Sequence, residues 1–270
     1  MPVSLDQIIG STRRKVAEAK RTADLRELER QAERHSPRGF RRALVEKSSL
    51  GVAVIAELKK ASPSKGLIRT EFRVQELARE LEAAGAAALS VLTDEEFFQG
   101  SLENLRLASV AVKIPCLRKD FIVDEFQLLE ARASSADAVL LIVAALSPTE
   151  LPALAIKARA RGLDVLCEVH DEEELRRALD AGCDLIGVNT RDLRTFKVDS
   201  DTAFRLAGNL PENVLKVAES GIRSGEDIAR LRAAGYQAFL IGEWLMRAER
   251  PGEALRALVA GVECRVPSRQ

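Results

Sequence analysis

From Gly51 onward, short apolar runs alternate with longer amphipathic segments, and this alternation limits the fold more than any other feature of the chain. Eight of the runs are almost continuously apolar, which is typical of strands in a parallel sheet that is covered on its outer face. The predicted strands are residues 52–59, 86–93, 115–120, 137–143, 163–169, 184–189, 214–220 and 237–242. The predicted helices are residues 74–84, 102–112, 124–133, 148–160, 172–181, 201–208, 224–234 and 251–260.

Strands that alternate with helices across short connections run parallel and are joined by right-handed crossovers. Eight such units predict a closed (β/α)8 barrel, the TIM-barrel class of α/β folds. The main alternative, an open doubly wound sheet, normally has a G-x-G-x-x-G turn after its first strand. The corresponding turn here, residues 61–66, reads ASPSKG and contains one glycine, which favours the barrel.

The chain of 270 residues contains no linker or low-complexity segment, so we expect a single domain over residues 1–270. Residues 51–262 would form the barrel, and residues 1–50 a helical extension at its N-terminus. Residues 5–34 predict one long helix with Ser4 as its N-cap, although the glutamate of a capping box is missing. Acidic and basic residues alternate along this helix, which favours a solvated face over an arm that binds nucleic acid.

Composition excludes several classes of function. The 41 Lys and Arg residues balance the 41 Asp and Glu residues, and only 4% of the chain is aromatic. Neither a basic surface nor an aromatic platform for nucleic acid is therefore expected. The longest apolar run, residues 138–146, is too short to cross a bilayer, and the first 15 residues lack the features of a signal peptide. We expect a cytoplasmic protein with no membrane partner.

Cysteines and histidines predict no metal site. The cysteines lie far apart, at Cys116, Cys167, Cys183 and Cys264, and form no Cys-x-x-Cys pair. This spacing does not match the usual zinc motifs, and we expect four unpaired, buried thiols in a reducing compartment. With His35 and His170 as the only histidines, a Ser-His-Asp triad is not expected either.

Ionisable residues gather at the carboxyl ends of the predicted strands, where a barrel of this kind carries its chemistry. They are Glu57, Lys59, Lys119, Glu168 and Glu219. Each alone fits a solvated loop residue, and Glu57 with Lys59 fits a simple ion pair. Five of them at one mouth favour a site, because charged groups are rarely buried unpaired. Close pairing also shifts the pKa values of lysine and glutamate toward those of acid–base catalysts, and the lysines would repel a metal ion.

The loops after the last two predicted strands are typical of a phosphate site. Residues 220–224, Ser-Gly-Ile-Arg-Ser, precede a helix, and Gly242 follows the final strand. Glycine lets backbone N–H groups approach phosphate oxygens, and a helix N-terminus favours negative charge. Ser62 adds a hydroxyl from the loop after the first strand, whereas Glu243 must turn its carboxylate away from a phosphate. The residues alone thus predict an enzyme for a small phosphorylated substrate, and they do not name the reaction.

Five motifs resemble those of the indole-3-glycerol phosphate synthase family, and the likeness covers essentially the whole chain. They are IAELKKASPSKG (55–66), PCLRKDFIVDEFQLLEAR (115–132), GVNTRDLRTFKVD (187–199), VAESGIRSGEDI (217–228) and FLIGEWLMR (239–247). The resemblance implies a (β/α)8 barrel with an N-terminal segment over its mouth. It also implies a carboxy-lyase of tryptophan biosynthesis that needs no cofactor. The enzyme would convert 1-(2-carboxyphenylamino)-1-deoxyribulose 5-phosphate to indole-3-glycerol phosphate, carbon dioxide and water.

Matching motif positions imply roles for single residues. Lys119 would protonate the substrate ketone, Glu168 would stabilise the cationic intermediate, and Glu57 would hold Lys119 in place and shuttle a proton. Lys59 would act as an acid in dehydration or bind the substrate's carboxylate or phosphate. The resemblance also implies that Asn189, Glu219 and Ser220 orient sugar hydroxyls and lysines, that Arg191 approaches the carboxylate, that Ser62, Gly221 and Gly242 bind phosphate, and that Phe98 and Phe121 line the aromatic ring. Trp244, the only tryptophan, stands where the family pattern predicts a small residue.

Two alternatives stay open on the sequence. A phosphoribosylanthranilate isomerase is another phosphate-binding barrel of the same pathway, but it would use a Cys/Asp or paired-Asp couple in place of lysine and glutamate. A non-catalytic scaffold would have no need of Lys119 and Glu168. We expect a monomer whose partner is a small phosphorylated substrate, with contacts to other tryptophan-pathway enzymes left open.

Overall fold

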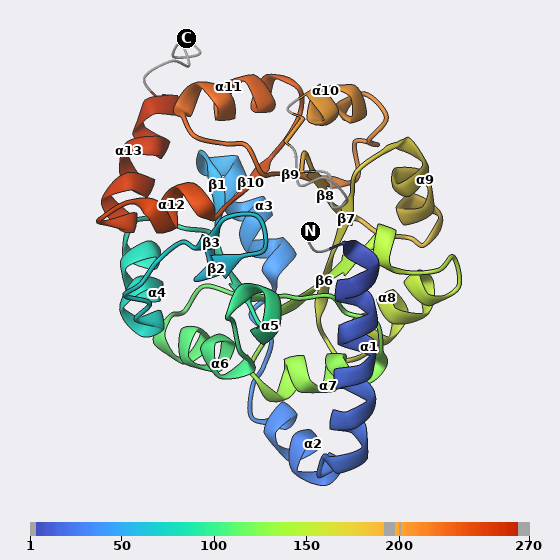
Figure 1. Ribbon diagram of the computed structural model, residues 1–270. Coiled ribbons are helices and arrows are strands. Elements are labelled where there is room, and N and C mark those ends of the chain that lie inside the picture. Colours follow the sequence, from blue (N-terminus) through green and yellow to red (C-terminus); the bar gives the residue numbers. More distant parts are fainter. Residues whose placement is uncertain (1–3, 192–197, 200, 264–270) are drawn as a thin grey trace.

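The computed structural model describes residues 4–191, 198–199 and 201–263, and its centre is a closed ring of eight parallel strands (Figure 1). Neighbours in the ring follow the order β1-β10-β9-β8-β7-β6-β5-β4, and β4 pairs back to β1. The strands are β1 (Ala53–Leu58), β4 (Ala88–Leu92), β5 (Cys116–Lys119), β6 (Ala138–Ile142), β7 (Asp164–Val169), β8 (Leu185–Asn189), β9 (Leu215–Glu219) and β10 (Ala238–Ile241). All eight lie within the predicted runs, so the predicted fold class is confirmed.

Helices surround the ring on its outer side (Figure 1). Those that follow the eight strands are α4 (Val74–Ala83), α6 (Leu102–Ala111), α7 (Glu125–Ala133), α8 (Glu150–Ala160), α9 (Glu172–Asp180), α10 (Asp201–Ala207), α11 (Gly225–Ala233) and α13 (Pro251–Glu263). Each matches a predicted helix, although α8 begins two residues after Pro148, which lies in the preceding turn. Pro251 is the first residue of α13, as its fixed φ allows.

The buried apolar residues form two clusters, one inside the ring of strands and one between the strands and the surrounding helices. Alternate residues of each strand face opposite sides, so Val54 and Ala56 pack against the helices while Ala53 and Ile55 face the barrel interior. The interior cluster also contains Leu117, Leu140, Leu166, Val217 and Leu240. The barrel is therefore filled with apolar side chains below its mouth.

The N-terminal extension consists of three helices, so the prediction of one helix over residues 5–34 is wrong. They are α1 (Leu5–Thr22), α2 (Leu25–Glu33) and α3 (Phe40–Leu50). The break comes at Asp24, whose carboxylate accepts the backbone N–H groups of Arg26 and Glu27 and so begins a new helix. Ser4 caps α1 as predicted, and Gln7 completes a capping box in place of the missing glutamate.

The extension is tied to both ends of the barrel. At the amino ends of the strands, Phe40 and Leu44 of α3 join the interior cluster, and α3 is visible within the ring in Figure 1. Between α2 and α3, His35 and Arg38 hold the buried carboxylate of Asp137 at 3.0 and 2.6 Å. At the opposite end, ion pairs and hydrogen bonds hold α1 against the loops and helices of the mouth. The pairs are Ser11–Glu96, Lys15–Glu96, Lys20–Asp124 and Arg13–Glu150.

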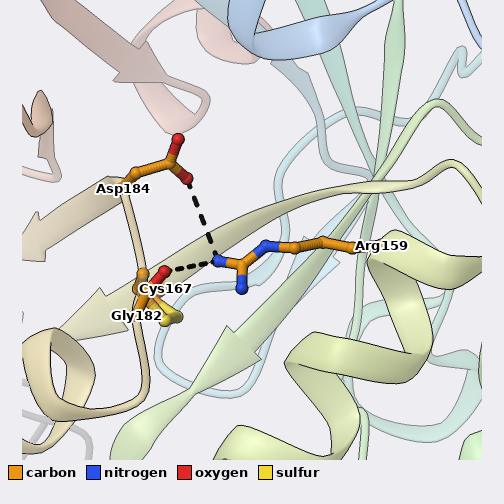
Figure 2. Close-up of a disulfide and its surroundings, with 5 residues drawn as sticks. Arg159, Cys167, Gly182 and Asp184 are labelled. Carbon is orange, nitrogen blue, oxygen red and sulfur yellow. Dashed lines mark hydrogen bonds and ion pairs between the residues drawn. A yellow bond between two sulfur atoms is a disulfide. The ribbon is translucent and has the colours of Figure 1, made fainter.

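Two cysteines are paired, which corrects the expectation of four free thiols. Cys167 on the outer face of β7 forms a disulfide with Cys183 in the turn between α9 and β8 (Figure 2). Their Cα atoms are 6.5 Å apart, within the range that a disulfide spans. Arg159 closes the same turn by donating to the carbonyl oxygen of Gly182 at 2.7 Å. The sequence did not reveal this pair because the whole of α9 separates the two cysteines; Cys116 is free and buried, and Cys264 lies outside the described residues.

Several short elements at the mouth were not predicted. They are β2 (Ala61–Ser62) and β3 (Gly66–Leu67), which form a small antiparallel hairpin, α5 (Glu95–Phe98), the 310 turn η1 (Val143–Ala145) and α12 (Glu243–Arg247). Each is too short to produce a periodic pattern in the sequence. Within the described part of the chain, no helix has the length and apolar character needed to cross a membrane.

Candidate active site

A cavity of about 380 Å³ opens at the carboxyl ends of the strands. All thirteen residues singled out from the sequence line it: Glu57, Lys59, Ser62, Phe98, Lys119, Phe121, Glu168, Asn189, Arg191, Ser220, Glu219, Gly221 and Gly242. They come from seven different strands or the loops that follow them. The barrel topology therefore brings together groups that are far apart in the sequence.

Four charged side chains come from alternate strands of the ring. They are Glu57 of β1, Glu219 of β9, Glu168 of β7 and Lys119 of β5. Alternate strands of a TIM barrel contribute one layer of inward side chains, and that layer is normally apolar. Here the uppermost layer consists of three carboxylates around one ammonium group, and the exposed fraction of each carboxylate side chain is 4% or less.

Lys119 is the centre of this layer. Its Nζ atom lies 2.9 Å from Oε2 of Glu168 and 3.6 Å from Oε2 of Glu219. Burial alone would lower the pKa of Lys119, but the carboxylates of Glu168, Glu219 and Glu57 outweigh burial and raise that pKa above its ordinary value. The resting site therefore holds a protonated lysine that is out of bulk water.

The two glutamates nearest Lys119 are shifted in opposite directions. Burial opposes the charge of both, but the pairing with Lys119 and a nearby His170 lowers the pKa of Glu168. For Glu219, burial together with the neighbouring carboxylates of Glu168 and Glu57 outweighs Lys119 and raises the pKa to about 8. Glu168 therefore holds its negative charge more firmly than Glu219, which takes up a proton more readily, and such a difference separates acid and base roles in one site.

Two glycines make room for these carboxylates. A Cβ atom at Gly187 of β8 would overlap Oε1 of Glu219, and a Cβ atom at Gly242 would overlap the carboxylate of Glu57. The sequence had suggested Gly242 only as a phosphate contact, and it gave no role to Gly187. Their absent side chains are what allow β1 and β9 to place a glutamate in the barrel interior.

Lys59 follows β1 and reaches back over the mouth. Its Nζ atom lies 2.5 Å from Oε1 of Glu57, so the two residues form a second lysine–glutamate pair. The ion pair that the sequence allowed is present, and both partners line the cavity. The side chain of Lys59 is 17% exposed against 4% for Glu57, which puts the lysine nearer to the entrance.

Asn189 and Ser220 meet beside the charged layer. The hydroxyl of Ser220 donates to Oδ1 of Asn189 at 2.8 Å, and the same oxygen accepts the backbone N–H of Arg191 at 3.0 Å. Ser220 and Gly221 both have positive φ, at 68° and 76°. This turn after β9 places Ser220 and Gly221 along the lining of the cavity.

The suggested phosphate end contains a short helix and two arginines. Gly242 precedes α12, and Glu243 beside it is held by Arg191 at 3.5 Å and by Arg247 at 3.1 Å. The N-terminus of α11, which the sequence had offered for an anion, carries its own capping box of Ser224 and Asp227. The predicted phosphate contacts would therefore come from residues 220–222 and 242–244, the loops that usually bind phosphate in this fold.

One wall of the cavity is apolar. The rings of Phe98 and Phe121 lie with their centroids 6.4 Å apart at an angle of 39°. Leu5 and Ile8 of α1 line the same cavity, so the N-terminal extension forms part of the site. The cavity therefore joins an apolar wall to the charged layer of lysine and glutamates.

Comparisons with known proteins agree on one family. Residues 5–258 match the family model for indole-3-glycerol phosphate synthase. The chain belongs to this family. An indole-3-glycerol phosphate synthase of Koribacter versatilis is 61% identical over 259 residues, which cover 96% of this chain and 100% of that protein. Another, from Leptothrix cholodnii, is 48% identical and covers 95% and 98% of the two chains.

Solved structures that resemble this member of the indole-3-glycerol phosphate synthase family at low identity confirm its fold. Thiamine phosphate pyrophosphorylase from Pyrococcus furiosus superposes with a TM-score of 0.60 at 18% identity, covering 82% of this chain and 99% of that one. A mandelate oxidase variant gives 0.59 at 20% identity, with coverage of 79% and 72%. At these identities the similarity describes the barrel and not its chemistry.

Sequence reasoning about this indole-3-glycerol phosphate synthase family member missed several residues of the cavity and its surroundings. Leu5, Ile8 and Asp94 line the cavity and were not singled out. Trp244, noted from the sequence as a departure from the family pattern, lines it as well. His170, placed outside the chemistry by the sequence, lies 3.4 Å from Glu168. Its position directly after β7 was the available signal. Among the described residues, no group of three or more His, Cys, Asp and Glu side chains is arranged to hold a metal ion.

Proposed function

We propose that the protein closes an indole ring, converting 1-(2-carboxyphenylamino)-1-deoxyribulose 5-phosphate to indole-3-glycerol phosphate with loss of carbon dioxide and water. Family membership supports this activity. The structural observation that carries the mechanism is the Lys119–Glu168 pair in a cavity with one apolar wall. The expected substrate is also apolar at one end and charged at the other: it has an aromatic ring, then a ketone, then a phosphate.

Lys119 is assigned as the acid of the ring-closing step. The ring carbon that bears the carboxylate attacks the ketone, and the ketone oxygen must receive a proton as negative charge develops on it. Lys119 is protonated in the resting site because three carboxylates surround it. When Lys119 turns from Glu168 to the ketone, it loses that stabilisation and becomes a stronger acid. Its ammonium group also stabilises the developing alkoxide.

Glu168 is assigned to the cationic intermediate. After ring closure the anilino nitrogen carries positive charge as an iminium, and this cation draws the electrons of the departing carboxylate, which leaves as carbon dioxide. A buried, ionised carboxylate next to that nitrogen lowers the energy of the cation. Glu168 is such a group, since its pKa is lowered and it is almost completely buried.

The Lys59–Glu57 pair is assigned to the dehydration that follows. This step needs an acid for the leaving hydroxyl and a base for a ring proton. Lys59 and Glu57 are in contact, line the cavity and come from one strand end. Comparing Lys59→Ala with Glu57→Gln separates their roles: the variant without the acid accumulates the decarboxylated but still hydroxylated intermediate, which mass spectrometry detects.

The other lining residues are assigned to binding. Phe98 and Phe121 contact the aromatic ring, Arg191 approaches its carboxylate, and Asn189, Glu219 and Ser220 orient sugar hydroxyls and lysines. Ser62, Gly221 and Gly242 bind the phosphate. We further propose that residues 1–50 and 51–262 fold as one domain and that the protein acts in the cytoplasm as a monomer, which light scattering after gel filtration tests.

The deciding experiment is an absorbance or fluorescence assay for indole formation from the carboxyphenylamino substrate. No metal ion or nucleotide is added, and a parallel reaction contains a chelator. Indole formation at the same rate in both supports the proposal, and strong inhibition by the chelator contradicts its metal-free chemistry. Turnover of a phosphoribosylanthranilate without indole absorbance would instead support the isomerase. If cells that carry Lys119→Ala or Glu168→Gln behaved like cells with the wild-type protein, a non-catalytic scaffold would be the better explanation.

A further inference from the structure

His170 lies between the carboxylates of Glu168 and Glu174, just outside the cavity. It follows the last residue of β7, and its side chain is 13% exposed. Its Nδ1 atom lies 2.9 Å from Oε2 of Glu174, and its Nε2 atom lies 3.4 Å from Oε1 of Glu168. Lys119 contacts the other oxygen of Glu168, Oε2. The carboxylate of Glu168 therefore lies between two cationic side chains, one on each oxygen.

We propose that His170 is a positioning residue for Glu168, which it keeps ionised and correctly oriented while Lys119 is engaged with the substrate. This inference rests on the proposed function, because it gives a partner to the carboxylate that stabilises the cationic intermediate. His170 is not among the residues that line the cavity. It acts through Glu168 and has no direct contact with substrate.

The protonation of His170 follows from its neighbours. Each ring nitrogen faces a carboxylate: Nδ1 is hydrogen-bonded to Glu174, whereas Nε2 lies at ion-pair distance from Glu168 and makes no hydrogen bond. A carboxylate cannot donate a proton to either nitrogen, so this arrangement favours the ring that carries both protons. Burial alone would lower the pKa of His170, but Glu168 and Glu174 outweigh burial and raise it to about 10. These are the charged groups that face the ring, from β7 and α9, and Lys119 of β5 acts on it through Glu168.

The anchoring of His170 explains why it would remain in place during turnover. Oε2 of Glu174 accepts both the ring Nδ1–H and the backbone N–H of His170, the latter at 2.8 Å. Lys119 by contrast must leave Glu168 to reach the ketone. When Lys119 has left, burial favours protonation of Glu168. The positive charge of His170, which stays beside Oε1, opposes that protonation. The fixed partner thus preserves the negative charge when the cationic intermediate needs it.

A pH profile separates this positioning role from a structural one. We compare kcat of the wild type with His170→Gln, which removes the positive charge, and with Glu174→Gln, which keeps the histidine and weakens its anchor. His35→Gln is the control, because it changes the other histidine at the opposite end of the barrel. Since kcat reports groups in the substrate complex, its acid limb includes the ionisation of Glu168, and a shift of that limb in His170→Gln identifies the contribution of Glu168.

The expected result is that the acid limb of kcat moves up by about one pH unit in His170→Gln, the size of shift that one nearby charge produces. On that limb kcat is then about tenfold lower than in the wild type, while KM changes by less than about twofold because substrate contacts are intact. Glu174→Gln moves the limb in the same direction by less, and His35→Gln leaves it unchanged. A limb that stays in place in His170→Gln, or a kcat lowered equally at every pH, overturns the proposal.

Nitrogen-15 NMR of the two histidine rings tests the same idea without turnover. A His170 ring that keeps both protons to above pH 8 in the wild type supports the proposal, and a ring that titrates below pH 8 overturns it. This readout also distinguishes two kinds of failure. A wild type that forms no indole product refutes the proposed function, whereas an active enzyme with an ordinary His170 titration refutes the inference alone.

Discussion

Nζ of Lys119 and Oε2 of Glu168 are 2.9 Å apart, although their strands, β5 and β7, are not neighbours in the ring. β6 lies between them and presents Leu140 and Ile142 to the interior. The contact exists because alternate strands of a TIM barrel place inward side chains in one layer. A buried pair of this kind adds little net stability. Its value is chemical, since it keeps an ammonium group and a carboxylate charged in a site with little water.

Replacing Lys119 tests this view of the pair. We expect Lys119→Ala to lower kcat by at least about 100-fold, the scale of one positioned general acid. Lys119→Arg should be similarly slow, because it restores the positive charge but a guanidinium does not release its proton. Substrate affinity, measured by calorimetry, should survive in both because the phosphate loops are separate. An arginine variant with near-normal turnover would show that charge alone is sufficient and that Lys119 is not the acid.

Gly187→Ala tests the geometry of the layer without changing any charged residue. The added Cβ would overlap Oε1 of Glu219 and displace that carboxylate. We expect kcat to fall by about 100-fold, since misplacing a site group by an ångström has effects of that size. Gly208→Ala is the matched control, because nothing lies within 4 Å of a Cβ there and its φ is not positive. Equal activity of the two variants would contradict the need for space at residue 187.

The barrel was predictable because its sequence signals are long and repeated. Most strands are nearly continuous apolar runs. Four helices are each followed, two residues after their last residue, by a glycine with positive φ: Gly85, Gly162, Gly182 and Gly235. The break between α1 and α2 was also present in the sequence, since Asp24 is a good N-cap. It was overlooked because apolar residues at helical spacing, Leu25 and Leu28, continue beyond it.

The contacts that tune the site could not be read from the sequence. Gly187 lies so close to Glu219 that a Cβ atom there would overlap its carboxylate. This closeness depends on the register of β8 against β9, in which Asn189 pairs with Glu219. The contact of His170 with Glu168 depends on how the chain turns after β7. A sequence indicates which side chains reach the mouth of the barrel, because strand ends are evident. It does not indicate which two of them touch, because that requires the closed ring.

Asp137 should make stability depend on pH at the amino ends of the strands. Burial would raise its pKa, but His35 and Arg38 outweigh burial and lower it. A carboxyl with a lowered pKa stabilises the fold above its ordinary pKa, and this contribution is lost as the pH falls through the lower, folded-state value. We expect Asp137→Asn to reduce the free energy of unfolding by about 3 kcal/mol at pH 6. The difference should shrink toward pH 3, as measured by urea denaturation; a constant difference would contradict the ion pair.

Trp244 should report the arrival of a phosphate group. It is the only tryptophan, lines the cavity, is partly buried, and lies two residues after Gly242 at the suggested phosphate end. Phosphate binding at this loop would change the field and the water around the indole ring, so its emission should shift. Glycerol 3-phosphate and inorganic phosphate are suitable probes because neither fluoresces. Trp244→Phe should abolish the signal and keep turnover within a few fold of the wild type. Calorimetric binding of either probe with no change in Trp244 emission would place the phosphate elsewhere in the cavity.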